Sequence, residues 1–451
     1  MLPSLANYCR VRHFGCFEQI IIGLLALLCV DQIQGQTLEL TGQTMGPIEY
    51  RVLLVNPTDG EPLDRSSIAA TVGAELELVN RLMSTYRPDS DVSRFNQSDS
   101  TEWFPVDSLT AEVVGRSIQI SEQTDGAFDI TVGPAVAMWN FGAHGKSNGV
   151  PSPTEIDAVK QKIGYQLLSV RKEPPALKKQ KAGVEIDLSA IAKGYAVDRV
   201  ALALERLGLV DYMVEVGGEV RALGKNDSGT PWRIGIEKPT ENSREVLSLA
   251  GLEEMSLATS GDYRSYRVVD GKRFSHTIDP RTSRPVELGL ASASVVCPDC
   301  MTADALATAM MVIGSNSGKD TGGVKKECLD FCRQHQIEAF FVLRDRPGGT
   351  GPSALQTFWT DRFPLVPEEI GLVENEEAGG LSIWPALLSA VLLFGLAILA
   401  MAVGTIFANK PIQGSCGGLS TRTGSDGDTS CSLCQKPVTD CSELDQKNES
   451  P

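Results

Sequence analysis

Residues 185–194, with the sequence EIDLSAIAKG, combine a predicted strand, a turn and the start of a helix. The helix is expected to run over 189–207, with Ser189 as its N-cap. A turn that leads into a helix directs free backbone N–H groups toward one point, which suits an anion. Lys193 adds positive charge there, and Gly194 permits close approach. The segment indicates either an anion site or simply a capped helix packed on a strand.

Helical and extended segments alternate on both sides of this stretch. Apolar residues recur at helical spacing in one early segment, at Ile68, Val72, Leu76, Val79 and Leu82. Further along, 212–216 is expected to be a strand that ends at Gly217-Gly218, and 302–313 is expected to be a helix. The elements interleave without a regular βαβ rhythm, so the predicted fold class is α+β, in one large domain over 36–364.

The composition excludes one class of partner. The chain of 451 residues has 57 acidic and 41 basic residues, a formal charge of -16. A nucleic-acid surface needs clustered positive charge, so we expect no nucleic-acid binding and interpret the acidity as a source of solubility. None of the eleven cysteines lies between Gln36 and Val296, so the main domain is expected to depend on its apolar core instead of disulfides.

Two apolar segments lie outside this domain. The first, within 1–35, follows basic residues and is typical of a secretory signal or anchor with a poor cleavage site. An acidic linker is expected over 365–380, followed by a transmembrane helix over 381–409. Lys410 follows the helix, so the positive-inside rule places the tail, 410–451, in the cytoplasm. We therefore expect a bacterial inner-membrane protein with a periplasmic main domain.

Three short patterns are candidates for chemistry. Asp304 and Thr308 share one helix face, where their oxygens suit a hard cation, although a helix cap explains Asp304 equally well. Phe128, in the sequence GAFD, could stack on a planar ring or belong to the core. His276 could be a general base or a hydrogen-bonded structural residue. None of these patterns decides the function alone.

The order of the motifs resembles the ApbE family of FAD-dependent protein FMN transferases. The resembling stretches are Thr44–Gly46, Met83–Tyr86, Ser93–Asn96, Thr124–Asp129, Asp187–Gly194, Val216–Glu219, Ala258–Tyr263, His276–Pro285 and Ala303–Thr308. They span nearly the whole domain in family order. Two small departures are Pro47, where the family often has Thr, and Ser283, which replaces a usual Gly.

The resemblance implies a T-fold-like domain and assigns roles to particular residues. The residues that match the family's FAD site are Met45, Tyr86, Gly126, Ala127, Phe128, Asp187, Lys193 and Ile278. Mg²⁺ would be held by Asp304, Thr308 and the backbone oxygen of Ala190, while Ala307 stands where some members have a further carboxylate. The implied reaction is attack by a Thr or Ser hydroxyl of a target protein on FAD, with release of AMP. His276 is the candidate that takes the hydroxyl proton.

The tail carries a second resemblance. The sequence MAVGTIF at 401–407, followed by KPI at 410–412 and GSCGGL at 414–419, resembles the maturation protein of the sodium-translocating NADH:quinone reductase. That family is linked to iron supply, so the resemblance implies metal handling by Cys416, Cys431, Cys434 and Cys441, whose thiolates suit iron or zinc. It also implies subunits of that reductase as acceptors of FMN. The alternatives are a periplasmic FAD pyrophosphatase and a non-catalytic flavin-binding protein, and for the tail incidental cysteines without a metal.

Overall fold

The computed structural model describes residues 37–56, 63–143, 149–240, 244–287, 289–315, 321–344 and 355–367, together with two short strands near the C-terminus. The chain divides into two compact units, Met1–Glu368 and Glu369–Pro451. In the second unit the description covers only β18 (Arg422–Thr423) and β19 (Thr429–Ser430), which pair antiparallel. The first unit is the main domain.

The main domain is built on an eight-stranded sheet in which every neighbouring pair is antiparallel. In spatial order its strands are β1 (Thr37–Thr44), β2 (Ile48–Val55), β6 (Tyr212–Val216), β7 (Glu219–Leu223), β10 (Met255–Gly261), β15 (Leu290–Cys297), β16 (Glu338–Arg344) and β17 (Leu355–Trp359). Strands distant in the sequence therefore lie side by side at the middle of the sheet. The predicted strand 212–216 is confirmed as β6.

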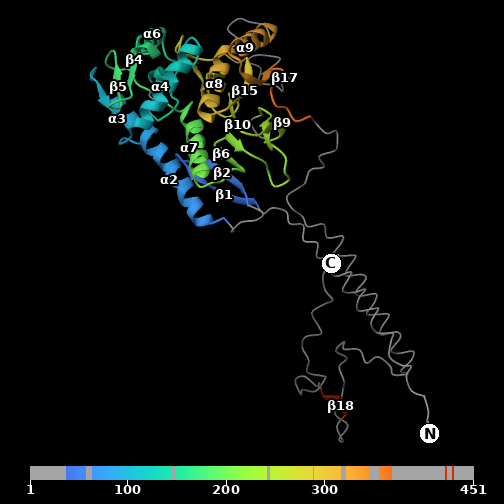
Figure 1. Ribbon diagram of the computed structural model, residues 1–451. Helices are drawn as coiled ribbons and strands as arrows, with labels where there is room; N and C mark the ends of the chain where they lie inside the picture. Colours follow the sequence, from blue (N-terminus) through green and yellow to red (C-terminus); the bar gives the residue numbers. More distant parts are fainter. Residues whose placement is uncertain are drawn as a thin grey trace, which may run out of the picture. The chain divides into compact units, whose positions relative to one another are not determined.

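Three helices cover one face of this sheet (Figure 1). They are α2 (Arg65–Met83), α7 (Ala192–Arg206) and α8 (Cys300–Ile313). The five apolar residues at helical spacing in α2 are all buried, because that stripe faces the core. α8 confirms the helix expected over 302–313 and is buried along most of its length between α7 and strands β10 and β15.

A hairpin covers a second apolar cluster, on the other face of the sheet. It consists of β8 (Trp232–Glu237) and β9 (Val246–Leu252). Along β6, Val214 belongs to the core under the helices and Met213 to the cluster under the hairpin, as the alternation of a strand requires. Leu365 pairs with Ala250, so the packing of the domain extends past the expected start of the linker. Helices on one face of an antiparallel sheet fit the predicted α+β class.

The remaining elements, except α9, form the flank of the domain that carries α4. They comprise the helices α3 (Asp91–Gln97), α4 (Ser108–Gln123), α5 (Gly133–Met138), α6 (Pro153–Lys160) and α9 (Thr321–His335), the 3-10 turns η1 (Ile130–Val132) and η2 (Tyr165–Leu167), and the short strands β3 (Phe104–Pro105), β4 (Leu168–Arg171), β5 (Ala176–Lys179), β11 (Tyr266–Val269), β12 (Lys272–Ser275), β13 (Ile278–Asp279) and β14 (Arg284–Pro285). Strands β3, β5 and β4 form a small sheet of their own, and β11–β12 and β13–β14 are separate two-stranded hairpins. α9 instead packs near α8 and β16.

The predicted N-cap at Ser189 is wrong. The helix begins at Ala192, and its N-cap, Ile191, makes no side-chain capping bond. The reason is local, because the N–H of Ser189 donates to the Asp187 carboxylate at 2.8 Å. That bond closes a turn before the helix can start.

The strand predicted at the start of 185–194 is also wrong. Residues 184–188 have no strand assignment. The backbone N–H of Ile186 donates to Asn96 Oδ1, and its carbonyl accepts from Asn96 Nδ2, both at 2.8 Å. A side-chain amide thus takes the place that a neighbouring strand would have.

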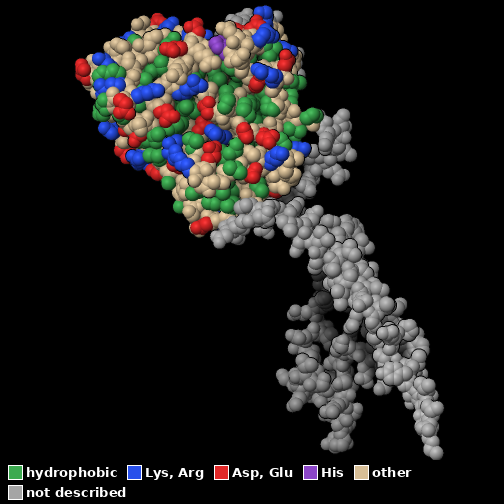
Figure 2. Space-filling model, in the orientation of Figure 1, with side chains coloured by type: hydrophobic (Ala, Val, Ile, Leu, Met, Phe, Trp, Pro, Cys, Tyr) green, Lys and Arg blue, Asp and Glu red, His purple; other side chains and the backbone are tan. Residues whose placement is uncertain are grey.

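Acidic and basic side chains are interspersed on the face shown in Figure 2. The main-domain cysteines are buried and form no disulfide among the described residues, which fits a domain that depends on its core; they are Cys297, Cys300, Cys328 and Cys332. Within the part of the chain that the structure describes, no helix has the length and hydropathy needed to cross a bilayer. The leader 1–35 and the expected helix 381–409 lie outside the described residues, so both stay predictions.

Candidate active site

Three charged side chains meet at the junction of α7, α8 and β7. Lys193 Nζ lies 2.5 Å from Glu219 Oε1 and 3.5 Å from Asp304 Oδ1. Both carboxylate side chains are 3% exposed, and that of Lys193 is 26% exposed. Two buried carboxylates thus share one ammonium group, and the lysine side chain that carries it is partly exposed.

The local backbone explains how these residues meet. Gly217 and Gly218 adopt φ values of 63° and 102°, so the chain turns tightly between β6 and β7 and places Glu219 at the first position of β7. On α7, a Cβ added at Gly194 would lie 2.2 Å from the carbonyl oxygen of Cys300. Only glycine therefore lets α7 approach α8 closely enough for the Gly194 N–H to donate to Asp304 at 3.0 Å.

The electrostatics of this cluster are strongly perturbed. Burial acts to lower the pKa of Lys193, but the neighbouring Asp304 and Glu219 carboxylates outweigh it and raise that pKa. Burial and the Asp304 charge raise the pKa of Glu219, against the opposing effect of the ammonium. Glu219 Oε2 is buried and has no hydrogen-bond partner among the described residues. A buried acceptor left open in this way is typical of a site that awaits another group.

Two of the predicted metal-binding residues, Asp304 and Thr308, lie on α8 next to this cluster, and the third, Ala190, precedes α7. Thr308 lies one turn after Asp304 on α8, and its hydroxyl is 3.0 Å from that of Ser260 on β10. The Ala190 carbonyl accepts no hydrogen bond from the described residues, because the Gly194 N–H, its usual helical partner, donates to Asp304. A carboxylate, a hydroxyl and a free carbonyl are all hard oxygen donors, which fits Mg²⁺. Ala307 is fully buried in the core and adds no ligand.

A second group of predicted residues lies around η1. The Asp187 N–H donates to the Ile130 carbonyl at 2.7 Å, which joins the 185–194 segment to the segment after α4. Gly126 has a φ of 70°, and a Cβ there would lie 3.9 Å from Arg281 Cγ. The N–H groups of Gly126, Ala127 and Phe128 are already bonded to residues at the end of α4. A ligand would therefore meet the carbonyls and the surface of this loop.

Phe128 and Ile278 are core residues. Phe128 is 3% exposed and packs in the main core, so its ring is not available for stacking. Ile278 is 5% exposed and packs with Trp139. Of the two interpretations of Phe128, the core is the one that the structure supports.

Met45 and Tyr86 lie in loops. Met45 has a φ of 49° in the tight turn between β1 and β2. Nearby Ile48 reaches toward Gly217, where a Cβ would lie 2.9 Å from Ile48 Cγ2 and 3.4 Å from Lys193 Cδ. The turn that carries Met45 thus borders the charged cluster. Tyr86 is 72% exposed, so its ring is free to stack on a ligand.

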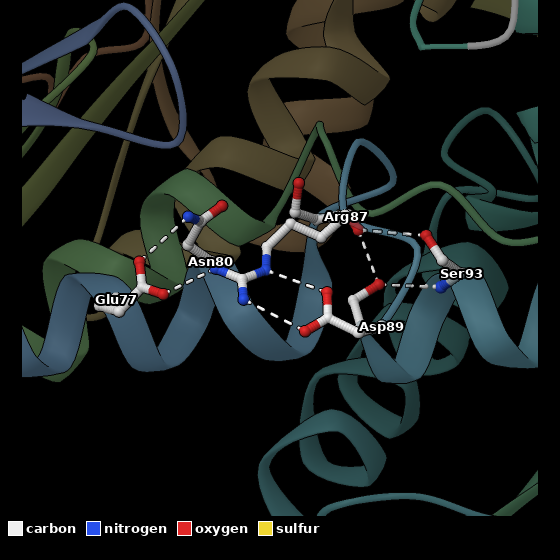
Figure 3. A network of polar contacts seen from close by, with 7 residues as sticks. Glu77, Asn80, Arg87, Asp89 and Ser93 are labelled. Atoms are coloured by element: carbon white, nitrogen blue, oxygen red, sulfur yellow. Dashed lines mark hydrogen bonds and ion pairs between the residues drawn. The ribbon is translucent and has the colours of Figure 1, made fainter.

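The loop that carries Tyr86 is anchored by polar contacts (Figure 3). Arg87 donates to Glu77 at 2.7 Å and to both Asp89 oxygens at 3.2 and 3.3 Å. On the other side the Ser93 hydroxyl lies 3.3 Å from the Ser84 carbonyl. These contacts hold the two ends of the loop and leave its aromatic side chain free.

His276 lies at the end of the β11–β12 hairpin. Its Nδ1 is 2.8 Å from the Ser265 carbonyl oxygen. A carbonyl can only accept, so Nδ1 carries the proton and Nε2 presents a lone pair. Burial lowers the pKa of His276 and the Lys193 charge adds to this, against the opposing effects of the Ser265 carbonyl and the Asp262 charge. Nε2 is therefore the ring nitrogen that can accept a proton.

Sequence reasoning missed Glu219 and Ser260 as site residues, although both stand in motifs that the resemblance quotes. A signal for Glu219 was its place directly after Gly217-Gly218, where a tight turn fixes a strand's first residue.

The tail residues predicted to bind a metal, Cys416, Cys431, Cys434 and Cys441, lie outside the described residues. Among the described residues, no group of three or more His, Cys, Asp or Glu side chains is placed to hold a metal.

Two surface cavities lie elsewhere, around Gln336, Ile337 and Glu338. The larger has a volume of about 430 Å³ and includes Thr302 and Leu306. Those residues are two positions from Asp304 along α8, on another face of the helix. None of the predicted site residues lines either cavity.

Comparison with known proteins covers both units. Residues 45–328 match the family model described as the ApbE family, and residues 405–450 match that described as (Na+)-NQR maturation NqrM. The FAD:protein FMN transferase of Vibrio cholerae is 41% identical over 66% of this chain and 88% of its own length. That of Haemophilus influenzae is 38% identical over 73% and 95%. The solved flavin transferase ApbE from Vibrio cholerae superposes with a TM-score of 0.63 and 36% identity, covering 73% of this chain and 99% of the other.

Proposed function

The chain belongs to the ApbE family, and we propose on this basis that it transfers FMN from FAD to a hydroxyl side chain of another protein. The names of its relatives and solved neighbours support this activity. The observation that carries the proposal is that Asp304 lies 3.5 Å from Lys193 and also accepts the Gly194 N–H, so that the Ala190 carbonyl accepts no hydrogen bond from the described residues. His276, with its Nδ1 held by the Ser265 carbonyl, offers Nε2 as a proton acceptor.

Asp304, Thr308 and the Ala190 carbonyl would hold Mg²⁺. The ion would supply charge neutralisation at the FAD diphosphate. The protein's own groups act around it. Lys193, whose side chain is partly exposed, binds a phosphate oxygen, and Tyr86 offers an exposed ring to a planar part of FAD.

In the transfer step the acceptor hydroxyl oxygen attacks the phosphorus of the FMN half of FAD. A new P–O bond forms to the acceptor, and the bond between that phosphorus and the bridging oxygen breaks, so AMP leaves. His276 Nε2 takes the hydroxyl proton, since Nδ1 is already held by Ser265. The Ser265 carbonyl stabilises the imidazolium that results, because it accepts from Nδ1 in both states.

The test is co-expression with a candidate acceptor subunit and mass spectrometry of that acceptor. The expected result is an FMN adduct on a Thr or Ser, with AMP as the other product. Asp304→Ala is expected to abolish the adduct, and Arg333→Ala, an exposed change on α9, serves as the matched control. Release of free FMN without an adduct would indicate a pyrophosphatase. Tight FAD binding without either product would indicate a flavin-binding protein.

The second proposal concerns the tail. The match of residues 405–450 to a maturation family supports a role for the four tail cysteines in supplying iron to a sodium-translocating NADH:quinone reductase. Subunits of that reductase are then the proposed FMN acceptors. The proposed topology is an inner-membrane protein with the main domain in the periplasm and the tail in the cytoplasm. A membrane-impermeant thiol reagent that labels Cys431 in intact cells would contradict this topology.

A further inference from the structure

We propose that Glu219 is a positioning residue that holds the Lys193 ammonium away from Asp304, so that the Asp304 carboxylate stays available to a divalent cation. This inference rests on the proposed function, because it takes Asp304 as a ligand of the cation. It assigns a role to a buried acid that the resemblance did not place in the site.

The two distances at Lys193 are the starting point. The ammonium is 2.5 Å from Glu219 and 3.5 Å from Asp304, so it is bonded to the first and merely near the second. Both acids are almost completely shielded from water, which leaves the ammonium no solvent partner on that side. The position of Lys193 is therefore decided by competition between two carboxylates.

The backbone fixes the two competitors unequally. Glu219 is held at the start of β7 by the turn at Gly217-Gly218. Asp304 is held on α8, and its Oδ2 accepts the Gly194 N–H. Its Oδ1 is the oxygen that faces Lys193, and it has no hydrogen-bond donor besides that ammonium among the described residues. Oδ1 is thus the free oxygen that both the ammonium and a cation would use.

Loss of the Glu219 carboxylate changes this competition. The lysine side chain has a flexible four-carbon stem, so its ammonium can shift to the next acid. An ammonium bonded to Asp304 Oδ1 would compete with a divalent cation for the same oxygen. Glu219→Gln should therefore weaken cation binding although Glu219 is not itself a ligand.

The experiment measures Mn²⁺ binding to the full-length protein in detergent by electron paramagnetic resonance of free Mn²⁺, without FAD. Asp304→Ala defines the background from other sites, including the tail. Glu219→Gln is expected to weaken binding at the Asp304 site about tenfold, the scale of one displaced charge interaction. Glu219→Asp, which retains a carboxylate on a shorter stem, is expected to bind Mn²⁺ with an affinity between those of the wild type and Glu219→Gln.

The double variant Glu219→Gln/Lys193→Met separates the explanations. Without the ammonium there is nothing to compete, so the double variant is expected to bind Mn²⁺ within about twofold of the wild type. A double variant as weak as Glu219→Gln would overturn the proposal, because Glu219 would then act as a ligand or through the fold. Unchanged affinity in Glu219→Gln would overturn it too. If Glu219→Gln does not fold, a Glu219→Asp variant that binds Mn²⁺ as tightly as the wild type would overturn the proposal instead.

Failure of the proposed function gives a different result. If wild type and Asp304→Ala bind Mn²⁺ equally, the cation site itself is wrong, whatever Glu219 does. If the Asp304-dependent site is present but insensitive to Glu219, only the positioning role is lost.

Discussion

Ser283 gives a stability prediction that follows directly from the backbone. It has a φ of 56°, in the left-handed region, and its side chain is fully buried. Its hydroxyl has no hydrogen-bond partner among the described residues. Ser283→Gly should remove both defects. The backbone bonds at this position, from the Ser283 N–H to Asp279 and from Trp139 Nε1 to the Ser283 carbonyl, need no side chain and should remain.

The size of the effect can be worked out from its parts. A non-glycine residue in the left-handed region costs about 1–2 kcal/mol. A buried hydroxyl without a partner costs about 1–3 kcal/mol. Against these gains, glycine lowers the free energy of unfolding by about 0.5–1 kcal/mol, because its unfolded chain has more conformational entropy. The space left by the hydroxymethyl group lowers it further. The net expectation is an increase of about 1–2 kcal/mol in the free energy of unfolding, or about 2–4 °C in Tm.

The assay is thermal and urea unfolding of the wild type, Ser283→Gly and Ser283→Ala under one set of conditions. Ser283→Ala removes the unpaired hydroxyl but leaves a Cβ at the strained φ, so it should recover about half of the gain. Equal gains in the two variants would show that the backbone strain contributes nothing. A Tm at or below that of the wild type for Ser283→Gly would refute the reasoning as a whole.

Three further predictions concern the site and the tail. Because burial lowers the pKa of His276, kcat/KM for transfer should stay high down to a pH below the ordinary imidazole value of about 6.5 and should fall as His276 becomes protonated. In His276→Ala this loss of kcat/KM at acid pH should disappear. If the loss persists in the variant, His276 is not the base. Gly194→Ala would push a Cβ into the Cys300 backbone, so it should destabilise the domain by about 1–3 kcal/mol and weaken Mn²⁺ binding, and a variant with unchanged Tm would disprove the close approach. Cys416→Ser should leave FMN transfer intact and lower the iron content of the reductase, and reductase iron at the wild-type level would contradict the carrier role.

Sequence periodicity predicted the large elements well. The apolar stripe of α2 and the strand Tyr212–Val216 are local patterns, so they could be read without the fold. The start of α7 could not, because it depends on one competing bond from Ser189 to the Asp187 side chain. The strand expected before it fails because its pairing groups are taken by Asn96, which lies 90 residues away.

The placement of site residues was predictable where two of them stand at a fixed spacing on one helix. Asp304 and Thr308 lie four apart on one helix, and the structure does place their side chains beside Lys193 and Ser260. Glu219 was not predicted, because a single acid after two glycines is commonly a surface residue. Its burial arises only when α7 and α8 pack over the middle of the sheet, and that packing is a property of the whole domain.

The bond between the Gly194 N–H and Asp304 joins residues 110 positions apart, and this separation sets an order on the protein's synthesis. A nascent chain has made the Met45 turn, the Tyr86 loop and the Lys193 helix long before it reaches α8. Until the ribosome has passed residue 304, Lys193 and Glu219 have no Asp304 to face, and the Gly194 N–H has no carboxylate to bond. A truncated or half-translated product therefore lacks this contact and the proposed cation site, which can form only after most of the domain has been translated.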